Sequence, residues 1–418
     1  DKPLTSQQTS GLLYTLCIML HKLILKRLLF LLIILDLILF LFLLAPAPNF
    51  KTYPELAEFQ GTEDFNTLKG YFVDLAQKKG APYAYEILKR ATVKPNTDMH
   101  LLGHVIGEVL YKQKRAEGMK YCTQDFRNAC SHTIVVGLFS ERGEEAIPEI
   151  ANACDLAPGG RGAYNMCFHG LGHGVLAYTG YELAKAVDIC SKFKKNKQKG
   201  REFPECVGGA IMEIISGGDH DKDLWKRQSQ KYLGTDDPLY PCNAEFIPQE
   251  AKGQCYIYLT PHLPRFAGGD LHHPTEENFT DAFKYCERLT QNDINRLICY
   301  AGFGKDFVVY AKERDIRDIA SMSDEQMIKV YRWCALADKK DGELACIKSA
   351  LGSIYWGGEN DRSGAIRFCN LSDTKEKRDS CFNNLITMVD YFFSDKSYKK
   401  GFCDEVPSEF KNACEEMI

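Results

Sequence analysis

Sixteen of the 17 cysteines fall into eight ordered pairs in the part of the chain that follows residue 120. The two cysteines of a pair are close, and successive pairs begin 32 to 52 residues apart. The pairs are Cys122 with Cys130, Cys154 with Cys167, Cys190 with Cys206, Cys242 with Cys255, Cys286 with Cys299, Cys334 with Cys346, Cys369 with Cys381, and Cys403 with Cys414. An even number of cysteines is typical of a disulfide framework in a compartment that oxidises thiols. We therefore predict one disulfide within each pair, although the spacing alone leaves bridges between neighbouring pairs open.

The sequence around the cysteine pairs also repeats. In Cys286–Cys299 and in Cys369–Cys381, the first cysteine ends an apolar helical run and a polar stretch with capping residues follows. The second cysteine then lies in another amphipathic segment, so each pair predicts a hairpin of two helices. Closing a loop of about 13 residues contributes roughly 3 kcal/mol by restricting the unfolded chain. One hairpin cannot bury its apolar face alone, so we expect an all-α solenoid of stacked, disulfide-stapled hairpins.

A family resemblance supports the same architecture. The run Leu351–Gly358 (LGSIYWGG) is similar to the LGxxYxxG run of the cysteine-rich Sel1-like repeat proteins of bacteria, which are tetratricopeptide relatives with one disulfide per helical hairpin. The likeness covers only the cysteine-paired region, and most cysteine spacings are longer here than in that family. The resemblance implies helical-hairpin repeats and partner binding, and it implies nothing about catalysis.

The N-terminal region contains a long apolar segment, Leu28–Leu44, that is interrupted only by Asp36. At about 1.5 Å per residue, such a helix just spans a bilayer core. Three basic residues precede it: Lys22, Lys26 and Arg27. By the positive-inside rule, the N-terminus is expected in the cytoplasm and everything after Ala45 outside. We predict a retained single-pass anchor; a cleaved signal peptide is the alternative, although Pro48 makes a poor residue after a cleavage site.

The predicted organisation has five parts. They are a cytoplasmic tail (1–27), a transmembrane anchor (28–46), an N-terminal helical cap that includes the first histidine motif (47–120), histidine-bearing repeats (121–235) and further disulfide-linked repeats (236–418). Within the cap, amphipathic patterns predict helices over Phe65–Lys79 and Pro82–Ala91. Pro82 suits the first turn of the second helix, where no amide hydrogen is needed.

Composition and motifs exclude several function classes. Apolar residues make up 45% and charged residues 26% of the chain, as in a folded protein, and the net charge of −4 provides no basic field for nucleic acid. The gaps within the cysteine pairs are longer than those of zinc ribbons and knuckles. Covalent c-type haem is excluded because the sequence has no C-x-x-C-H motif. Motifs of zinc proteases, serine hydrolases, P-loop enzymes and dinucleotide-binding enzymes are also missing from the sequence.

Five of the ten histidines lie in three related strings: HLLGHVIG from residue 100, CSHTIVVG from residue 130 and CFHGLGHG from residue 167. His132 and His169 each follow the second cysteine of their pair by two residues, and His100 fits the same position in a preceding repeat. Equal positions of successive repeats lie on neighbouring helices, about 8–10 Å apart. His104 and His173 add a second row one helical turn further on. We therefore expect the five imidazoles to lie together.

Such a cluster predicts a mononuclear or dinuclear transition-metal site. The predicted ligands are His100, His104, His132, His169 and His173. Zinc, copper and iron all suit imidazole, and haem held without covalent attachment by a histidine pair is an alternative cofactor. Glu108, one turn beyond His104, and Glu213, on the next repeat, are candidates to complete the shell or to act as a base. On this interpretation the chain is a membrane-anchored extracytoplasmic metalloprotein, such as a metal-dependent oxidoreductase or hydrolase.

A second interpretation treats the histidines as core residues that hydrogen-bond where glycines let helices touch. The chain is then a disulfide-stabilised repeat scaffold that binds another protein of the cell envelope, in the periplasm or outside the cell. The later repeats carry Gly208, Ile257 and Ala301 at the aligned positions. A third interpretation therefore combines the two, with a histidine site in the N-terminal repeats and a partner on Cys242–Cys414. Whether the protein is an enzyme stays open at this stage.

Overall fold

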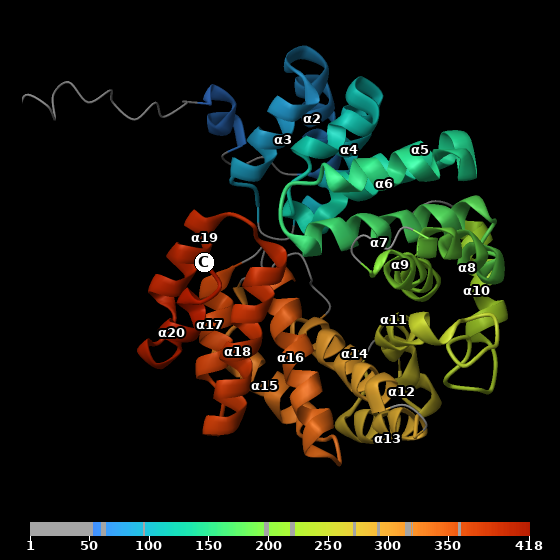
Figure 1. The fold of residues 1–418 in the computed structure, drawn as a ribbon, viewed down its shortest axis with the longest axis vertical. Coiled ribbons are helices and arrows are strands. Elements are labelled where there is room, and N and C mark those ends of the chain that lie inside the picture. The colour runs from blue at the N-terminus through green and yellow to red at the C-terminus, as the bar shows by residue number, and fades with distance from the viewer. Residues whose placement is uncertain are drawn as a thin grey trace, which may run out of the picture. The chain divides into compact units, whose positions relative to one another are not determined.

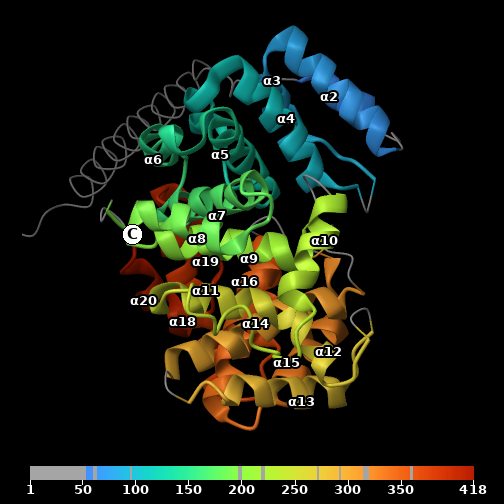
Figure 2. The same cartoon turned by 90° about the vertical axis from the view of Figure 1, so that its right-hand side faces the viewer.

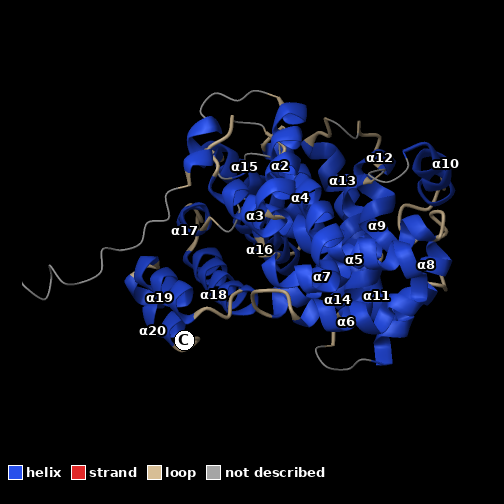
Figure 3. Cartoon of the chain, turned by 90° about the horizontal axis from the view of Figure 1, so that it is seen from above, coloured by secondary structure: helices blue, strands red, loops and turns tan. Residues whose placement is uncertain are grey.

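The computed structural model describes residues 53–418 except 60–63, 95–96, 196–199, 218–221, 271–272, 291–292, 314–318, 320 and 358–360. Throughout these residues the chain forms helices and loops and no strand, so the predicted all-α class is confirmed (Figure 3). The predicted anchor, Leu28–Leu44, lies outside the described residues. Within the part of the chain that the structure describes, no helix is long and apolar enough to cross a membrane.

A continuous row of helices runs through the unit Glu55–Ile418 (Figures 1 and 2). It consists of α4 (Met99–Lys114), α5 (Ala129–Arg142), α7 (Arg161–Tyr178), α9 (Glu202–Ser216), α11 (Gln249–Leu259), α14 (Asp293–Ala311), α16 (Lys340–Gly357) and α18 (Lys375–Phe392). Each helix of this row packs against the next one. One row helix comes from each successive hairpin, as expected when stacked repeats bury a common core.

The other helices precede, cover or follow this row. They are η1 (Pro54–Phe59), α2 (Phe65–Lys79), α3 (Ala81–Arg90), η2 (Arg115–Tyr121), η3 (Asp125–Asn128), η4 (Gly143–Ala146), α6 (Ile147–Asp155), α8 (Leu183–Ser191), η5 (Lys192–Lys195), α10 (Lys222–Leu233), η6 (Thr260–His262), α12 (Leu263–Phe266), α13 (Glu276–Glu287), α15 (Asp324–Cys334), α17 (Arg362–Asn370), α19 (Lys396–Glu405), η8 (Ser408–Phe410) and α20 (Lys411–Glu415). Helices α6, α8, α15 and α17 each pack on the row helices before and after them, which makes a second layer.

All eight predicted disulfides are present, and each joins the two cysteines of one pair. The bridges are Cys122–Cys130, Cys154–Cys167, Cys190–Cys206, Cys242–Cys255, Cys286–Cys299, Cys334–Cys346, Cys369–Cys381 and Cys403–Cys414. Their Cα atoms are 5.2–5.7 Å apart, within the range that a disulfide requires. All sixteen cysteines are buried, so the predicted pairing within each repeat is confirmed.

Two of the eight bridges differ from the predicted tie between two helices. In the other six, the bridge joins two successive helices of a hairpin, as predicted. Cys130 lies in the first turn of α5, but its partner Cys122 lies in the loop after η2 rather than in a helix. Cys255 lies within α11, but its partner Cys242 lies in a turn region between α10 and α11. The second cysteine of these two pairs is therefore helical as expected, whereas the first is held in an irregular segment.

The two helices predicted in the N-terminal cap are confirmed. Helix α2 spans Phe65–Lys79, and its first turn is capped by Asp64, whose carboxylate accepts from the Thr67 amide at 3.0 Å. Helix α3 begins one residue earlier than predicted and carries Pro82 in its first turn. Gly80 separates the two helices at a φ of 93°, a conformation that favours glycine.

Glycine lets neighbouring row helices come into backbone contact. A Cβ atom on Gly209 of α9 would lie 1.9 Å from the His169 carbonyl oxygen of α7, and one on Gly172 would lie 2.0 Å from the Cys206 carbonyl oxygen. The same arrangement joins α14 to α16, where a Cβ on Gly304 would lie 1.9 Å from the carbonyl oxygen of residue 346. Larger residues would push these helices apart, so the glycines set the spacing of the repeats.

The row also returns on itself. Helix α18 contacts α7 as well as α16, although more than two hundred residues separate the contacting positions. Six row helices, α7, α9, α11, α14, α16 and α18, therefore form a closed circuit of packed neighbours, and α4 and α5 extend the row beyond it. Figure 1 shows α18, in orange-red, coming back towards the start of α7.

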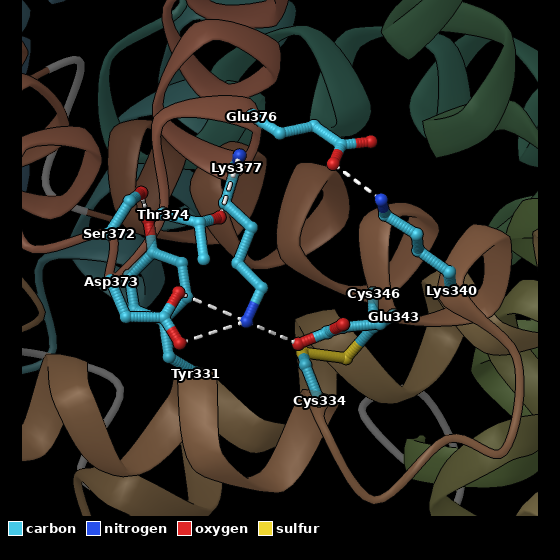
Figure 4. A network of polar contacts seen from close by, with 10 residues as sticks. All are labelled: Tyr331, Cys334, Lys340, Glu343, Cys346, Ser372, Asp373, Thr374, Glu376 and Lys377. Carbon is cyan, nitrogen blue, oxygen red and sulfur yellow. Dashed lines mark hydrogen bonds and ion pairs between the residues drawn. A yellow bond between two sulfur atoms is a disulfide. The ribbon is translucent and has the colours of Figure 1, made fainter.

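Ion pairs and tyrosines join the repeats near the C-terminus (Figure 4). The Lys377 ammonium of α18 lies 2.7 Å from the Glu343 carboxylate of α16 and 3.0 Å from Asp373. The Tyr331 hydroxyl donates to the Phe368 carbonyl oxygen at 3.0 Å and shares a hydrogen bond with Ser372. These contacts connect α15 to α17 and α16 to α18, beside the disulfide Cys334–Cys346.

Candidate functional site

The five histidines meet where α4, α5 and α7 pack together, as the alignment of the repeats predicts. We call His100, His104, His132, His169 and His173 the histidine row. Ring centroids of successive members are 4.6 Å apart for His100 and His104, and 6.2 Å apart for His104 and His132. The His132 ring lies 6.1 Å from that of His169 and 6.0 Å from that of His173. Gly170 makes this approach feasible, because a Cβ there would lie 2.3 Å from the His132 ring.

Hydrogen bonds at one end of the row fix the tautomer of His100. The His100 Nδ1 lies 2.6 Å from the Phe126 carbonyl oxygen, which can only accept, so Nδ1 carries the proton of a neutral ring. The His100 Nε2 is then the acceptor for His104 Nε2, at 3.1 Å. The His104 Nδ1 shares a hydrogen bond with the Thr133 hydroxyl at 2.8 Å. These ring nitrogens are therefore directed at one another and at the protein.

The prediction of a multi-histidine metal site is wrong. Across the described part of the chain, no group of three or more histidine, cysteine, aspartate or glutamate side chains is arranged to hold a metal ion. The repeat register brings the imidazoles together, but those of His100, His104 and His173 are engaged in hydrogen bonds within the protein. The interpretation of the chain as a metalloprotein, with a metal-dependent oxidoreductase or hydrolase activity, is corrected accordingly. The alternative of haem held by a histidine pair is not tested and stays a prediction.

Burial makes the middle of the row resemble a protein core. His132 and His169 are 8% and 2% exposed, and burial lowers the pKa of both imidazoles well below the usual value. Burial also lowers the pKa of His100. The rings are thus neutral at neutral pH. The His132 Nε2 and His169 Nδ1 have no hydrogen-bond partner, an exception to the pairing of nearly all buried polar groups in native proteins.

The two glutamates singled out from the sequence lie in different surroundings. Glu213 of α9 is buried and accepts from the His173 Nδ1 at 3.0 Å and from the Tyr181 hydroxyl at 3.1 Å. It therefore extends the histidine row to the next repeat. Glu108 lies on α4 one turn beyond His104 and is exposed. A role of either residue as a catalytic base stays a prediction.

A second polar cluster was missed in the sequence. Glu205 of α9 is buried and bonds to Arg201 at 2.6 Å, and it accepts from the Gln254 amide of α11 at 3.0 Å. Burial raises the pKa of Glu205 above its usual value, and burial likewise raises that of Tyr258. The Tyr258 ring lies 5.1 Å from the ring of His169, so the cluster continues the histidine row. A signal existed: Glu205 and Gln254 each directly precede the second cysteine of a pair.

Comparison of the chain with protein-family models, with curated proteins and with solved structures found no match. The likeness to Sel1-like repeats therefore concerns a short sequence run and the stapled helical hairpin. The structure defines the class of protein by its own architecture: an all-helical, disulfide-rich array of αα-hairpin repeats.

Proposed function

We propose that this chain is a disulfide-stabilised repeat scaffold that mediates protein–protein interaction at the cell envelope. The observation that carries the proposal is the continuous row of packed helices in which each hairpin from Cys122 onwards has its own disulfide. Stacked hairpins of this kind present an extended surface, and partner binding is the common use of such a surface.

Rigidity supports this function. Each bridge limits the unfolded chain, and the glycine contacts between α7 and α9 and between α14 and α16 set the spacing of the repeats. A surface that is ordered before binding loses less conformational entropy when a partner docks. The structure therefore supplies the preorganisation that a binding scaffold needs.

Location outside the cytoplasm is part of the proposal. Disulfides persist in secreted, periplasmic and cell-surface proteins and are rare where glutathione and thioredoxin keep thiols reduced. Eight buried bridges in one chain support an oxidising compartment. The membrane anchor that the sequence predicts would hold the scaffold at the envelope, and it stays a prediction.

Cross-linking mass spectrometry on cells that produce the protein tests this function. We expect one recurrent protein partner whose cross-links map to lysines of the repeats, and direct binding when that partner is purified. A variant lacking one bridge, with both Cys286→Ser and Cys299→Ser, should bind more weakly because the hairpin is less well ordered. A chain that gives no recurrent partner, or a purified candidate that does not bind the intact chain, would contradict the scaffold function.

A further inference from the structure

The contact that closes the circuit of row helices has the character of peptide recognition. The Phe392 carbonyl oxygen accepts from the Gly160 amide at 2.9 Å and from the Gln124 side-chain amide. The Ser394 hydroxyl donates to the Gly159 carbonyl oxygen at 3.1 Å, and the Asn165 amide donates to the Tyr391 hydroxyl. The segment Tyr391–Ser394 thus lies across the start of α7 and is bound through its backbone and its side chains.

Glycine makes room for the Phe392 ring. A Cβ atom on Gly162 would lie 1.8 Å from the Phe392 ring, so no other residue fits at this position without displacement of the ring. The indole of Trp356 covers another side of the ring, with centroids 4.3 Å apart at 74°. Gly159 has a φ of 128°, which glycine tolerates far better than other residues. The sequence Pro158–Gly162 (PGGRG) therefore shapes a place for one aromatic side chain.

The bound segment includes the end of a helix. Tyr391 and Phe392 are the last two residues of α18, and the backbone becomes extended at Phe393, with a φ of −121° and a ψ of 131°. Bound peptides are commonly held by hydrogen bonds that give affinity and by a site for a side chain that gives specificity. Both elements are present where Tyr391–Ser394 crosses α7.

When Tyr391–Ser394 is bound here, several buried polar atoms have no hydrogen-bond partner. The Gln124 Oε1 and one atom of the Asn165 amide have no partner, although these residues are only 6% and 1% exposed. The Trp356 Nε1 beside Phe392 is also unpaired. Native proteins pair nearly all buried polar groups, so a ligand that supplied N–H donors and an acceptor would fit better than Tyr391–Ser394 does.

We propose that Gln124, Gly159–Gly162 and Asn165 form a receptor for a peptide segment that carries an aromatic side chain and belongs to a partner protein. Tyr391–Ser394 fills this receptor while the partner is absent, and the partner segment displaces it. The inference rests on the proposed scaffold function and specifies the surface that binds. Covalent connection gives the internal segment a high effective concentration, so free peptides compete poorly until that segment is weakened.

The test uses the full chain and a labelled, end-blocked peptide with the sequence of residues 391–396, YFFSDK. We expect the Phe392→Ala variant to bind this peptide at least about tenfold more tightly than the unchanged chain, because the internal competitor is weakened. Adding Gly162→Val should abolish binding by filling the space for the ring. Adding Gly70→Val instead should preserve binding, because a Cβ at Gly70 has no neighbour within 4 Å. Fluorescence anisotropy measures all four proteins, after circular dichroism has shown that they are folded.

Equal binding to all variants, or no binding to folded Phe392→Ala, would overturn the receptor. If Phe392→Ala does not fold, hydrogen exchange of the unchanged chain decides: saturating peptide should accelerate exchange in residues 391–396, and unchanged exchange would overturn the proposal. The receptor and the scaffold function can be tested independently of each other. A partner that binds Gly162→Val as well as the unchanged chain keeps the scaffold function and rules out this receptor.

Discussion

The two ends of the helix row have the same architecture but differ in the side chains that pack between neighbouring repeats. We call such a contact region between repeats a joint. Where α4, α5 and α7 meet, histidine rings lie close to one another, and the histidine row ends on the buried carboxylate of Glu213. Where α16 and α18 meet, the rings of Trp356 and Phe392 pack with centroids 4.3 Å apart, and the ion pair between Lys377 and Glu343 joins the same two helices. A histidine cluster in a solenoid can therefore be a joint between repeats rather than a metal centre.

The two kinds of joint should behave differently in solution. The interactions of a Lys–Glu pair and of aromatic rings change little between pH 7 and pH 5, whereas histidine takes up a proton in this interval. The disulfides, in contrast, are of the same kind at both ends. We therefore expect the two ends to respond alike to loss of a bridge and differently to acid.

Loss of a disulfide should lower the stability of the protein most. The decrease should be similar at the two ends of the row. Cys154–Cys167 and Cys286–Cys299 both have a sequence separation of 13, so they close loops of equal length. Replacement of both cysteines of either pair by serine should lower the free energy of unfolding by about 2–5 kcal/mol. Urea unfolding followed by circular dichroism measures it. A cost confined to one end would show that the hairpins do not contribute equally to the scaffold.

Acid should weaken the histidine end selectively. His132 and His169 have folded-state pKa values below the ordinary value of 6.5, so the unfolded chain binds their protons more readily. Their contribution to stability is complete above pH 6.5 and falls as the pH drops below it, by about 1.4 kcal/mol per pH unit for each residue. The loss ends once the pH passes below the folded-state pKa. Protonation also sets like charges against each other along the row.

Hydrogen exchange with mass spectrometry, corrected for the intrinsic rate at each pH, locates this effect. Between pH 7 and pH 5.5, we expect exchange to accelerate in α5 and α7 and to stay nearly constant in α14 and α16. Burial lowers the pKa of His262, between the two ends, to about 4, so η6 should show a smaller response of the same sign. Equal acceleration at both ends would remove the distinction between the two kinds of joint.

A single substitution at His132 should reduce the acid sensitivity of the histidine end. His132→Leu keeps an apolar side chain among the other histidines and removes the unpaired Nε2. At pH 7 we expect a change of no more than about 1.5 kcal/mol in the free energy of unfolding, because the swap nearly conserves the buried volume. At pH 5.5 the variant should be more stable relative to the unchanged chain than at pH 7. The same pH dependence in both proteins would show that His132 does not carry the acid sensitivity.

How far the sequence predicts this structure depends on whether the information is local. The disulfide pairs and helix α2 were predictable because cysteine spacing, helical periodicity and a capping residue all act over a few residues. The meeting of His100, His132 and His169 followed from the repeat register. The direction of their hydrogen bonds did not, because it depends on three successive residues with positive φ, Phe126 to Asn128, which place the Phe126 carbonyl oxygen against His100.

The return of α18 to α7 was not predictable from a single repeat. Small rotations accumulate along a solenoid, and their sum decides whether distant repeats meet. The glycines at 159, 160 and 162 are visible in the sequence, but nothing local indicates that Phe392 fills the space they leave. The metal-site prediction was wrong for a similar reason. The sequence places five imidazoles together, but it does not determine where their nitrogen atoms point.

Loss of an ion pair at the C-terminal joint should change the stability least of all. The change should be larger for the less exposed pair than for the more exposed one. The side chains of Lys377 and Glu343 are 15% and 16% exposed, whereas those of Lys340 and Glu376, in the same view, are 68% and 56% exposed (Figure 4). Lys377→Met should therefore cost about 1 kcal/mol, and Lys340→Met should cost close to nothing. A thermal melt at pH 7 in low salt and in 1 M sodium chloride compares the two variants. Salt screens exposed charges and should lessen the cost at Lys377 only in part, because this pair is sheltered between α16 and α18. If both variants match the unchanged chain, the repeats at this end are joined by their aromatic core and disulfides, and the contrast with the histidine joint is one of acid response alone.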